Sequence, residues 1–265
     1  MIKIKKDRLG TIAPLFVGIE DSMVYACLQG HMGDAYVKTP VSPCAAVIVS
    51  GEYSFFGGDP DSSDAAYIIQ RLFEVIETGS TIGIFADGKP AWETRLMSVS
   101  ENNPLVVPRY GIVQKDYDFD TDRLDALVRA LPGGFALAPF DEAIYGQAIA
   151  EPWSREFCET FDSAEDYMAQ GFGFAALLDG RLVSGASAMT VYDGGIEVQV
   201  ATHEDFRQKG LAMPCAAALI RECVRRKMRP CWDAATLVSK EMALKLGYEY
   251  RGEYVTVHMT ASPVI

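Results

Sequence analysis

The feature that most constrains the fold is a succession of three alternating segments separated by two Asp-Gly turns. Apolar runs on both sides of Asp-Gly are a strong signal for an antiparallel hairpin, because both residues tolerate the backbone of a tight turn. The segments cover residues 173–179, 181–192 and 195–201, and the turns are Asp179-Gly180 and Asp193-Gly194-Gly195. The sequence therefore predicts a three-stranded antiparallel meander in the second half of the chain.

A short basic turn, Arg207-Gln208-Lys209-Gly210, follows the meander and precedes an amphipathic helix. The first N–H groups of a helix have no partner within the helix, and the helix dipole places about half a positive charge there. Gly210 and Ala212 leave room for the close approach of an anion, and Arg207 and Lys209 add positive charge. The turn therefore predicts a diphosphate site. The alternative is an ordinary strand-to-helix loop with a solvated Arg and Lys.

The elements of the chain occur in a similar order twice. Each half reads as a meander, a helix, a strand and a second helix, which indicates a distant internal duplication, but the first half lacks a counterpart of the basic turn. The Pro132-Gly133-Gly134 stop predicts two α/β domains, residues 1–132 and 133–265. Helices are expected over residues 11–30, 63–78, 141–150, 153–160, 164–170, 211–227 and 237–246, and a last hairpin over 248–259.

Composition narrows the partners and the compartment. The 265 residues carry a formal net charge of −12, which disfavours nucleic acid as a partner, whereas a cationic small substrate is compatible. The charged start of the chain, and the lack of an apolar run of about 20 residues, predict neither secretion nor a membrane span. Six scattered cysteines without Cys-x-x-Cys spacing or a Cys/His cluster predict no metal site. We therefore expect a cytoplasmic protein, with homodimer formation left open.

The motifs resemble the GNAT superfamily of acyl-CoA N-acyltransferases. Its Gln/Arg-x-x-Gly-x-Gly/Ala signature is matched by Arg207, Gly210 and Ala212, and its Lys-x-Gly-Phe/Tyr ending is similar to Lys245-Leu246-Gly247-Tyr248. The resemblance covers residues 134–259, and nearly the whole chain resembles the two-part family that includes zwittermicin A resistance-type acetyltransferases. It implies an α/β (α+β) fold with a GNAT-like mixed, mostly antiparallel sheet flanked by helices. A smaller N-terminal α/β unit, a candidate degenerate GNAT-like repeat, is expected to cover the acceptor site.

The resemblance also implies acetyl-CoA as the acetyl donor, without a metal. Backbone groups of Val198, Val200 and Ala201 would pair with the pantetheine arm, in a slot opened where the fourth and fifth strands of the sheet splay. The implied reaction is direct transfer of the acetyl group to the primary amine of a small cationic acceptor in a ternary complex. The residues implied to hold the pyrophosphate are Arg207, Gln208, Lys209, Gly210, Leu211 and Ala212.

Two positions depart from the family pattern. Thr236 stands where Asn is usual at the start of the fourth helix, and Ala243 stands where a Tyr general acid is usual. An alkyl amine has a pKa of about 10.4, so a base or a water chain must assist its deprotonation. Strand alternation makes Glu197 the first candidate base and His203 the second, each against the alternative of a solvated or structural side chain. Asp233 is expected to cap the next helix rather than to orient the substrate.

The predicted function is therefore an acetyl-CoA-dependent N-acetyltransferase. Because the usual Tyr is missing, a non-catalytic acyl-CoA-binding or sensing protein is the alternative, and a structural dimerisation module is a third class. A sensor would bind acetyl-CoA without releasing free CoA, and a dimerisation module would bind none.

Overall fold

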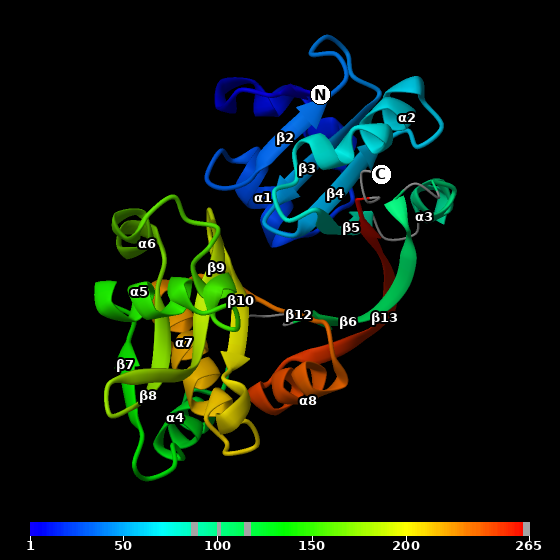
Figure 1. Cartoon of the computed structure of the whole chain (residues 1–265). Helices are drawn as coiled ribbons and strands as arrows, with labels where there is room; N and C mark the ends of the chain where they lie inside the picture. The colour runs from blue at the N-terminus through cyan, green and yellow to red at the C-terminus, as the bar shows by residue number, and fades with distance from the viewer. Residues whose placement is uncertain (86–89, 100–101, 114–117, 262–265) are drawn as a thin grey trace. The chain divides into compact units, whose positions relative to one another are not determined.

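A computed structural model describes residues 1–85, 90–99, 102–113 and 118–261, and the chain divides into two compact units (Figure 1). Unit 1 comprises Met1–Arg109 together with Glu253–Ile265, and unit 2 comprises Tyr110–Gly252. This division differs from the expected one at residue 132, for two reasons. The helix before that point packs within unit 2, and the last strand of the chain belongs largely to the sheet of unit 1.

Unit 2 is built on a five-stranded sheet in the order β11-β10-β9-β8-β7. The β10–β11 pair is parallel and the others are antiparallel, as a meander followed by a crossover helix requires. The strands are β7 (Ala136–Pro139), β8 (Gly173–Leu178), β9 (Arg181–Tyr192), β10 (Gly195–Thr202) and β11 (Arg229–Cys231). The helices are α4 (Thr121–Arg129), α5 (Glu142–Ala150), α6 (Ala164–Gln170), α7 (Ala212–Arg226) and α8 (Leu237–Leu246), with 3-10 turns η5 (Arg155–Phe157) and η6 (Glu204–Phe206). The predicted mixed, mostly antiparallel sheet flanked by helices is confirmed.

The two faces of this sheet are covered by different helices. On β9, Ser184 faces α7, where it hydrogen-bonds Cys215. Ser187 faces the opposite side, because side chains alternate along a strand, and its hydroxyl lies 2.6 Å from Tyr167 Oη on α6. The buried residues of α7 include Cys215, Ala216, Ala217 and Ala218, and these small side chains let the helix lie close to the sheet. Helix α4 packs on α7, with a 2.6 Å ion pair between Arg221 and Asp125.

Unit 1 contains most of an eight-stranded sheet in the order β1-β2-β3-β4-β5-β13-β6-β12. Strands β2, β3 and β4 form an antiparallel meander and β4 pairs in parallel with β5, so the unit repeats the succession of unit 2. The strands are β1 (Ile2–Lys3), β2 (Asp34–Val37), β3 (Ala45–Ser50), β4 (Tyr53–Gly58), β5 (Ser80–Phe85), β6 (Leu105–Val113), β12 (Asp233–Ala234) and β13 (Glu249–Thr260). The helices are α1 (Ser22–Leu28), α2 (Ser63–Gln70) and α3 (Pro90–Met97), with 3-10 turns η1 (Lys6–Thr11), η2 (Ala13–Phe16) and η3 (Leu72–Glu74). Strand β12 pairs with the part of β6 that belongs to unit 2.

The last element corrects the expected hairpin over residues 248–259. The segment is the single strand β13, whose residues 257–260 pair with β5. Val257 and Met259 are fully buried in the core of unit 1, beside Phe56 and Trp92. Gly252 has a positive φ of 118° but does not reverse the chain. The reason is that β13 lies between β5 and β6, so both of its edges are paired without a turn.

Three expected helices are shorter than predicted. The segment over residues 11–30 contains the end of η1, then η2 and α1, because Pro14 lies in the first turn of η2 and Gly18 adopts a φ of +91°. The helix over 63–78 ends at Gln70 and continues only as η3. The segment over 153–160 holds only η5, since the Ser154 hydroxyl donates to Ala148 O at 3.0 Å and turns the chain instead.

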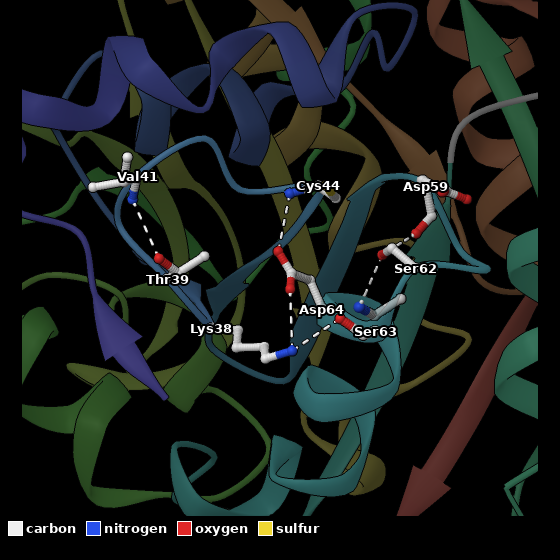
Figure 2. A network of polar contacts seen from close by, with 9 residues as sticks. Lys38, Thr39, Val41, Cys44, Asp59, Ser62, Ser63 and Asp64 are labelled. Carbon is white, nitrogen blue, oxygen red and sulfur yellow. Dashed lines mark hydrogen bonds and ion pairs between the residues drawn. The ribbon is translucent and has the colours of Figure 1, made fainter.

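A network of polar contacts surrounds the start of α2, where the chain arrives from β4 (Figure 2). Asp64, in the first turn of α2, is 7% exposed, and its Oδ2 accepts the N–H of Cys44 at 3.0 Å. Its Oδ1 lies 3.4 Å from Lys38 Nζ, which also donates to Ser63 Oγ at 2.9 Å. Ser62 caps the helix by accepting the N–H of Ala65. The first turn of α2 is therefore capped by the Ser62 hydroxyl, and an acidic side chain of the chain itself already lies at the positive end of the helix dipole.

Within the described ranges, no helix is long and apolar enough to cross a membrane. The same residues contain no group of three or more His, Cys, Asp and Glu side chains placed to hold a metal ion.

Candidate active site

The turn between β10 and α7 has an unusual backbone. Gln208 and Gly210 have φ values of +62° and +78°, the left-handed region that Gly adopts at little cost. A Cβ built on Gly210 would meet no atom within 4 Å, so the chain itself does not crowd this position. The glycine therefore serves the turn conformation, and its open side faces unoccupied space.

The start of α7 is suited to an anion. Its N-cap, Leu211, gives no side-chain hydrogen bond to the first turn, and that turn holds no acidic side chain. The helix is 15 residues long, so its dipole is developed along four turns. The first N–H groups of α7 thus lack the side-chain partner that most helix starts have. This geometry supports the diphosphate site predicted from the basic turn.

A cavity of about 540 Å³ lies between the start of α7 and one face of α8. Of the residues expected at the pyrophosphate, Gln208, Gly210, Leu211 and Ala212 line it. The lining residues that were not predicted from the sequence lie on one face of α8 or flank the turn. The full lining is Thr202, Phe206, Gln208, Gly210, Leu211, Ala212, Met213, Leu237, Val238, Glu241, Met242 and Lys245. Spacing along α8 could have shown that its lining residues share a face, but not what that face borders.

The two cations of the turn point elsewhere. Arg207 Nε donates to Thr202 O at 3.3 Å. Lys209 Nζ donates to Asp205 O at 2.9 Å and lies 4.5 Å from the centre of the Phe206 ring. Neither side chain lines the cavity, although both were expected at the pyrophosphate. Sequence could not predict this, because long side chains choose among rotamers according to their neighbours.

Strands β10 and β11 separate after a short pairing. They are joined in parallel only over Gly195–Glu197, while β10 stays paired with β9 as far as Thr202. A register shift on β9 between the partners of Glu197 and Val198 marks the point of divergence. Among the described strands, none pairs with the other edge of β10 from Val198 onward. Val198, Val200 and Ala201 therefore lie where the sequence predicted a slot with a free strand edge.

Glu197 is the last residue of β10 that pairs with β11. Glu197 is only 8% exposed, and its Oε1 accepts the N–H of Asp233 at 3.2 Å. Gln199, two residues further on the same face, donates its amide to a carboxylate oxygen of Glu156. The Glu197 carboxylate and the Gln199–Glu156 pair therefore lie on the same face of β10, opposite α7.

Thr190 lies directly across from Glu197 on β9 and was not selected from the sequence. It is fully buried, and its Oγ1 has no hydrogen-bond partner in the described part of the chain. Residues opposite one another in an antiparallel pair project to the same face, so this hydroxyl and the Glu197 carboxylate are neighbours. The extra residue Met189 shifts the alternation along β9, and periodicity alone could not have placed Thr190 there.

His203, the second candidate base, has both ring nitrogens engaged. Nδ1 accepts the N–H of Asp205 at 3.3 Å, and Nε2 lies 3.2 Å from the Arg181 guanidinium. The ring packs edge-on against Trp153 and Phe206, with centroid distances of 5.6 and 5.8 Å. These contacts are those of a side chain that holds the end of β10 and the start of η6 in place.

The start of α8 corrects the expectation for Asp233. Thr236 is the N-cap, and its hydroxyl accepts the N–H of Ser239 at 3.1 Å, whereas Asp233 lies in β12. Ala243 is fully buried. Burial raises the pKa of the nearby Tyr248 well above its ordinary value, and the Tyr248 hydroxyl donates to Pro230 O at 2.8 Å. Tyr248 is therefore no substitute for the missing general acid.

Comparisons with known proteins agree with this geometry. The profile described as GNAT acetyltransferase matches residues 13–257. A Bacillus subtilis (strain 168) protein named "Uncharacterized N-acetyltransferase YdfB" is 31% identical over 238 residues, 88% of each chain. The crystal structure of a GCN5-related N-acetyltransferase-like protein from Streptococcus suis 89/1591 matches with a TM-score of 0.85 at 33% identity, over 96% of this chain and 98% of the other. A tandem GNAT protein from the clavulanic acid biosynthesis pathway shares the fold, with a TM-score of 0.57 at 14% identity over 100% and 99% of the chains. These matches confirm the predicted resemblance and fold class.

Proposed function

The chain belongs to the GNAT acetyltransferase family and is an N-acetyltransferase, and we propose that it transfers the acetyl group of acetyl-CoA to the primary amine of a small cationic molecule. One observation carries the proposal. The buried Glu197 carboxylate lies where the free edge of β10 begins. This edge offers a slot for an extended arm, and the chain then leads through the basic turn to the uncapped start of α7, which is suited to an anion.

The donor fits the two ends of this strand. Pantetheine carries amides that resemble a peptide strand, and Val198, Val200 and Ala201 offer a free backbone edge of the same kind. The diphosphate would lie against the amides of the turn, with Gln208, Gly210 and the first residues of α7 around it. The acetyl group would then lie near the point where β10 and β11 diverge.

Glu197 is the proposed base. The acceptor reaches the enzyme mostly as an ammonium, because deprotonating an alkyl amine at pH 7 costs about 4 to 5 kcal/mol. Its proton passes to the Glu197 carboxylate, directly or through one water, and the nitrogen lone pair attacks the thioester carbonyl carbon. The N–C bond forms, the C–S bond breaks and CoA leaves as a thiolate.

The missing Tyr does not prevent this reaction. A thiol has a pKa of about 8.5, so its thiolate is a good leaving group near neutral pH and needs little help from a general acid. Ala243 is therefore compatible with turnover, and solvent can protonate the departing thiolate.

The acceptor is proposed to be cationic. Glu197 lies on the same face of β10 as Gln199, whose amide donates to the Glu156 carboxylate, so this face carries two carboxylates. The chain as a whole carries a formal net charge of −12, which raises the local concentration of a cation. A polyamine, an amino sugar or a similar compound fits these charges.

The test is turnover of acetyl-CoA against amino sugars, polyamines, amino acids and basic peptides, followed by Glu197→Gln on the best amine. The amide keeps an acceptor for the Asp233 N–H, so the fold is expected to survive. We expect kcat to fall about 100-fold or more near pH 7 and much less at high pH, where the amine is already neutral. Glu204→Gln, an exposed neighbour on η6, is the matched control.

Three results would contradict the proposal. Binding of acetyl-CoA without release of free CoA for any amine would indicate a sensor. Activity confined to basic peptides would exclude a small acceptor. An equal loss in Glu197→Gln at every pH would make Glu197 a structural residue.

A further inference from the structure

The cavity beside α7 contains two charged side chains among its lining residues, and both come from α8. They are Glu241 and Lys245, which lie one helical turn apart on the same face. The rest of the lining is apolar or uncharged, and includes Met213, Leu237 and Val238. The cation that shares this space with the amides of the turn is therefore Lys245, in contrast to the expectation from the basic turn.

Lys245 is available to a ligand. It is exposed, and within the described residues its Nζ forms no ion pair or hydrogen bond. Glu241, in contrast, lies 3.6 Å from Lys240 Nζ. Lys240 in turn lies over the Tyr250 ring, 4.9 Å from its centre, so its position is fixed from a second side. The negative charge at the cavity is partly compensated, whereas the positive charge is not.

We propose that Lys245 binds the diphosphate of the donor and makes the enzyme selective for a thioester that carries phosphate. This inference rests on the proposed function. An ammonium group is a compact charge that serves as a phosphate partner, and the first amides of α7 approach the same space from the other side. Phosphate oxygens between these two sets of donors would be bound from α7 and α8 together. The apolar lining residues would contact the uncharged part of the donor.

The first experiment measures CoA affinity by calorimetry in Lys245→Met and in the matched control Lys227→Met. Lys227 is exposed at the far end of α7 and adopts a left-handed conformation that Met tolerates as well as Lys does. Both variants change the net charge equally. We expect the Kd for CoA to rise about tenfold in Lys245→Met and less than about twofold in Lys227→Met. The difference should shrink at about 1 M salt, because screening weakens the ion pair.

The second experiment changes the donor. S-acetylpantetheine has the same arm and thioester as acetyl-CoA but no phosphate. Lys245→Met should lower kcat/KM for acetyl-CoA about tenfold and leave that for S-acetylpantetheine unchanged. Glu241→Gln should act in the opposite direction, tightening CoA about twofold by removing a like charge, again without effect on the uncharged donor.

The outcomes separate this inference from the proposed function. If the wild-type chain does not bind CoA, the proposed function fails. If it binds CoA and Lys245→Met binds equally well, or loses affinity for both donors alike, only the role of Lys245 is refuted. A larger loss of CoA affinity in Lys209→Met than in Lys245→Met would show that Lys209, the cation of the turn, binds the diphosphate instead.

Discussion

The chain twice connects the last strand of a meander to a helix, from β4 to α2 and from β10 to α7. The two connections differ in whether other parts of the chain occupy the space beside the end of the strand. Strand β4 pairs with β5 over Tyr53–Phe56, and its last two residues, Gly57 and Gly58, pair only with β3 on the other side. A Cβ on those residues, Gly57 and Gly58, would lie 2.7 Å from Leu15 O and 2.2 Å from Cys44 O. Backbone from elsewhere in unit 1 therefore occupies the space beside the end of β4.

In unit 2 the equivalent space is open. Strand β10 loses β11 after Glu197, and the Cβ position of Gly210 meets nothing within 4 Å. The helix starts differ in the same sense. Helix α2 has the Ser62 cap and Asp64 in its first turn (Figure 2), whereas α7 has no side-chain cap and no acidic residue in its first turn. One topology thus serves as a packed scaffold in unit 1 and as a binding site in unit 2. We expect one CoA per chain, bound at unit 2.

The largest expected effect is that of Gly210→Asp. The new carboxylate would project into the space of the diphosphate, and we expect CoA affinity to fall at least about 100-fold. Gly180→Asp is the matched control, because Gly180 also has a positive φ, +82°, and open space at its Cβ position. Both variants should lose a similar amount of stability in a thermal melt. Wild-type CoA affinity in Gly210→Asp, measured by calorimetry, would refute the site.

Gly58→Ala should have the opposite profile. Its methyl group would overlap the Cys44 carbonyl, and its φ is +88°, so we expect a loss of at least about 3 kcal/mol in the free energy of unfolding. Gly79→Ala, with a φ of +69° and open space, should cost only about 1 to 2 kcal/mol. Denaturant unfolding would measure both. Equal losses of unfolding free energy in the two variants would mean that the Cys44 backbone does not occupy the space beside Gly58.

Asp64→Asn is expected to have the smallest effect. The amide retains an oxygen for the Cys44 N–H but loses the charge that faces Lys38, so we expect unfolding to become about 1 to 2 kcal/mol easier. CoA affinity and stoichiometry should not change. The exposed Asp61→Asn is the control. A second equivalent of CoA bound by Asp64→Asn would show that this carboxylate excludes an anion from unit 1.

Much of unit 2 could be predicted from its sequence. The Asp-Gly turns located β8, β9 and β10 within a residue or two, and the helix expected over 211–227 is α7, Ala212–Arg226. Local turn chemistry and helical periodicity carry this information, because both act between near neighbours in the chain. The free edge of β10 was also predicted, through the family resemblance, and the open turn was predicted from the small residues Gly210 and Ala212.

The rest depends on contacts between distant segments. The directions of Arg207 and Lys209 are set by Thr202, Asp205 and Phe206, and no pattern in the turn reveals them. Lys245 belongs to the Lys-x-Gly-Phe/Tyr ending, but a helical pattern does not show which cavity a helix face borders. The hairpin expected over 248–259 was wrong for the same reason, since the strand partners of β13 are far away in sequence.

Strand β13 also determines when the protein can finish folding. It follows unit 2 in the chain, yet it lies between β5 and β6 and brings Val257 and Met259 into the core of the unit that is synthesised first. While the ribosome is still making unit 2, unit 1 lacks the strand that lies between β5 and β6 and has an open sheet edge on either side of the gap. The N-terminal unit is thus begun first but completed only after unit 2 has been made, and a nascent chain is most exposed to mispairing until β13 emerges.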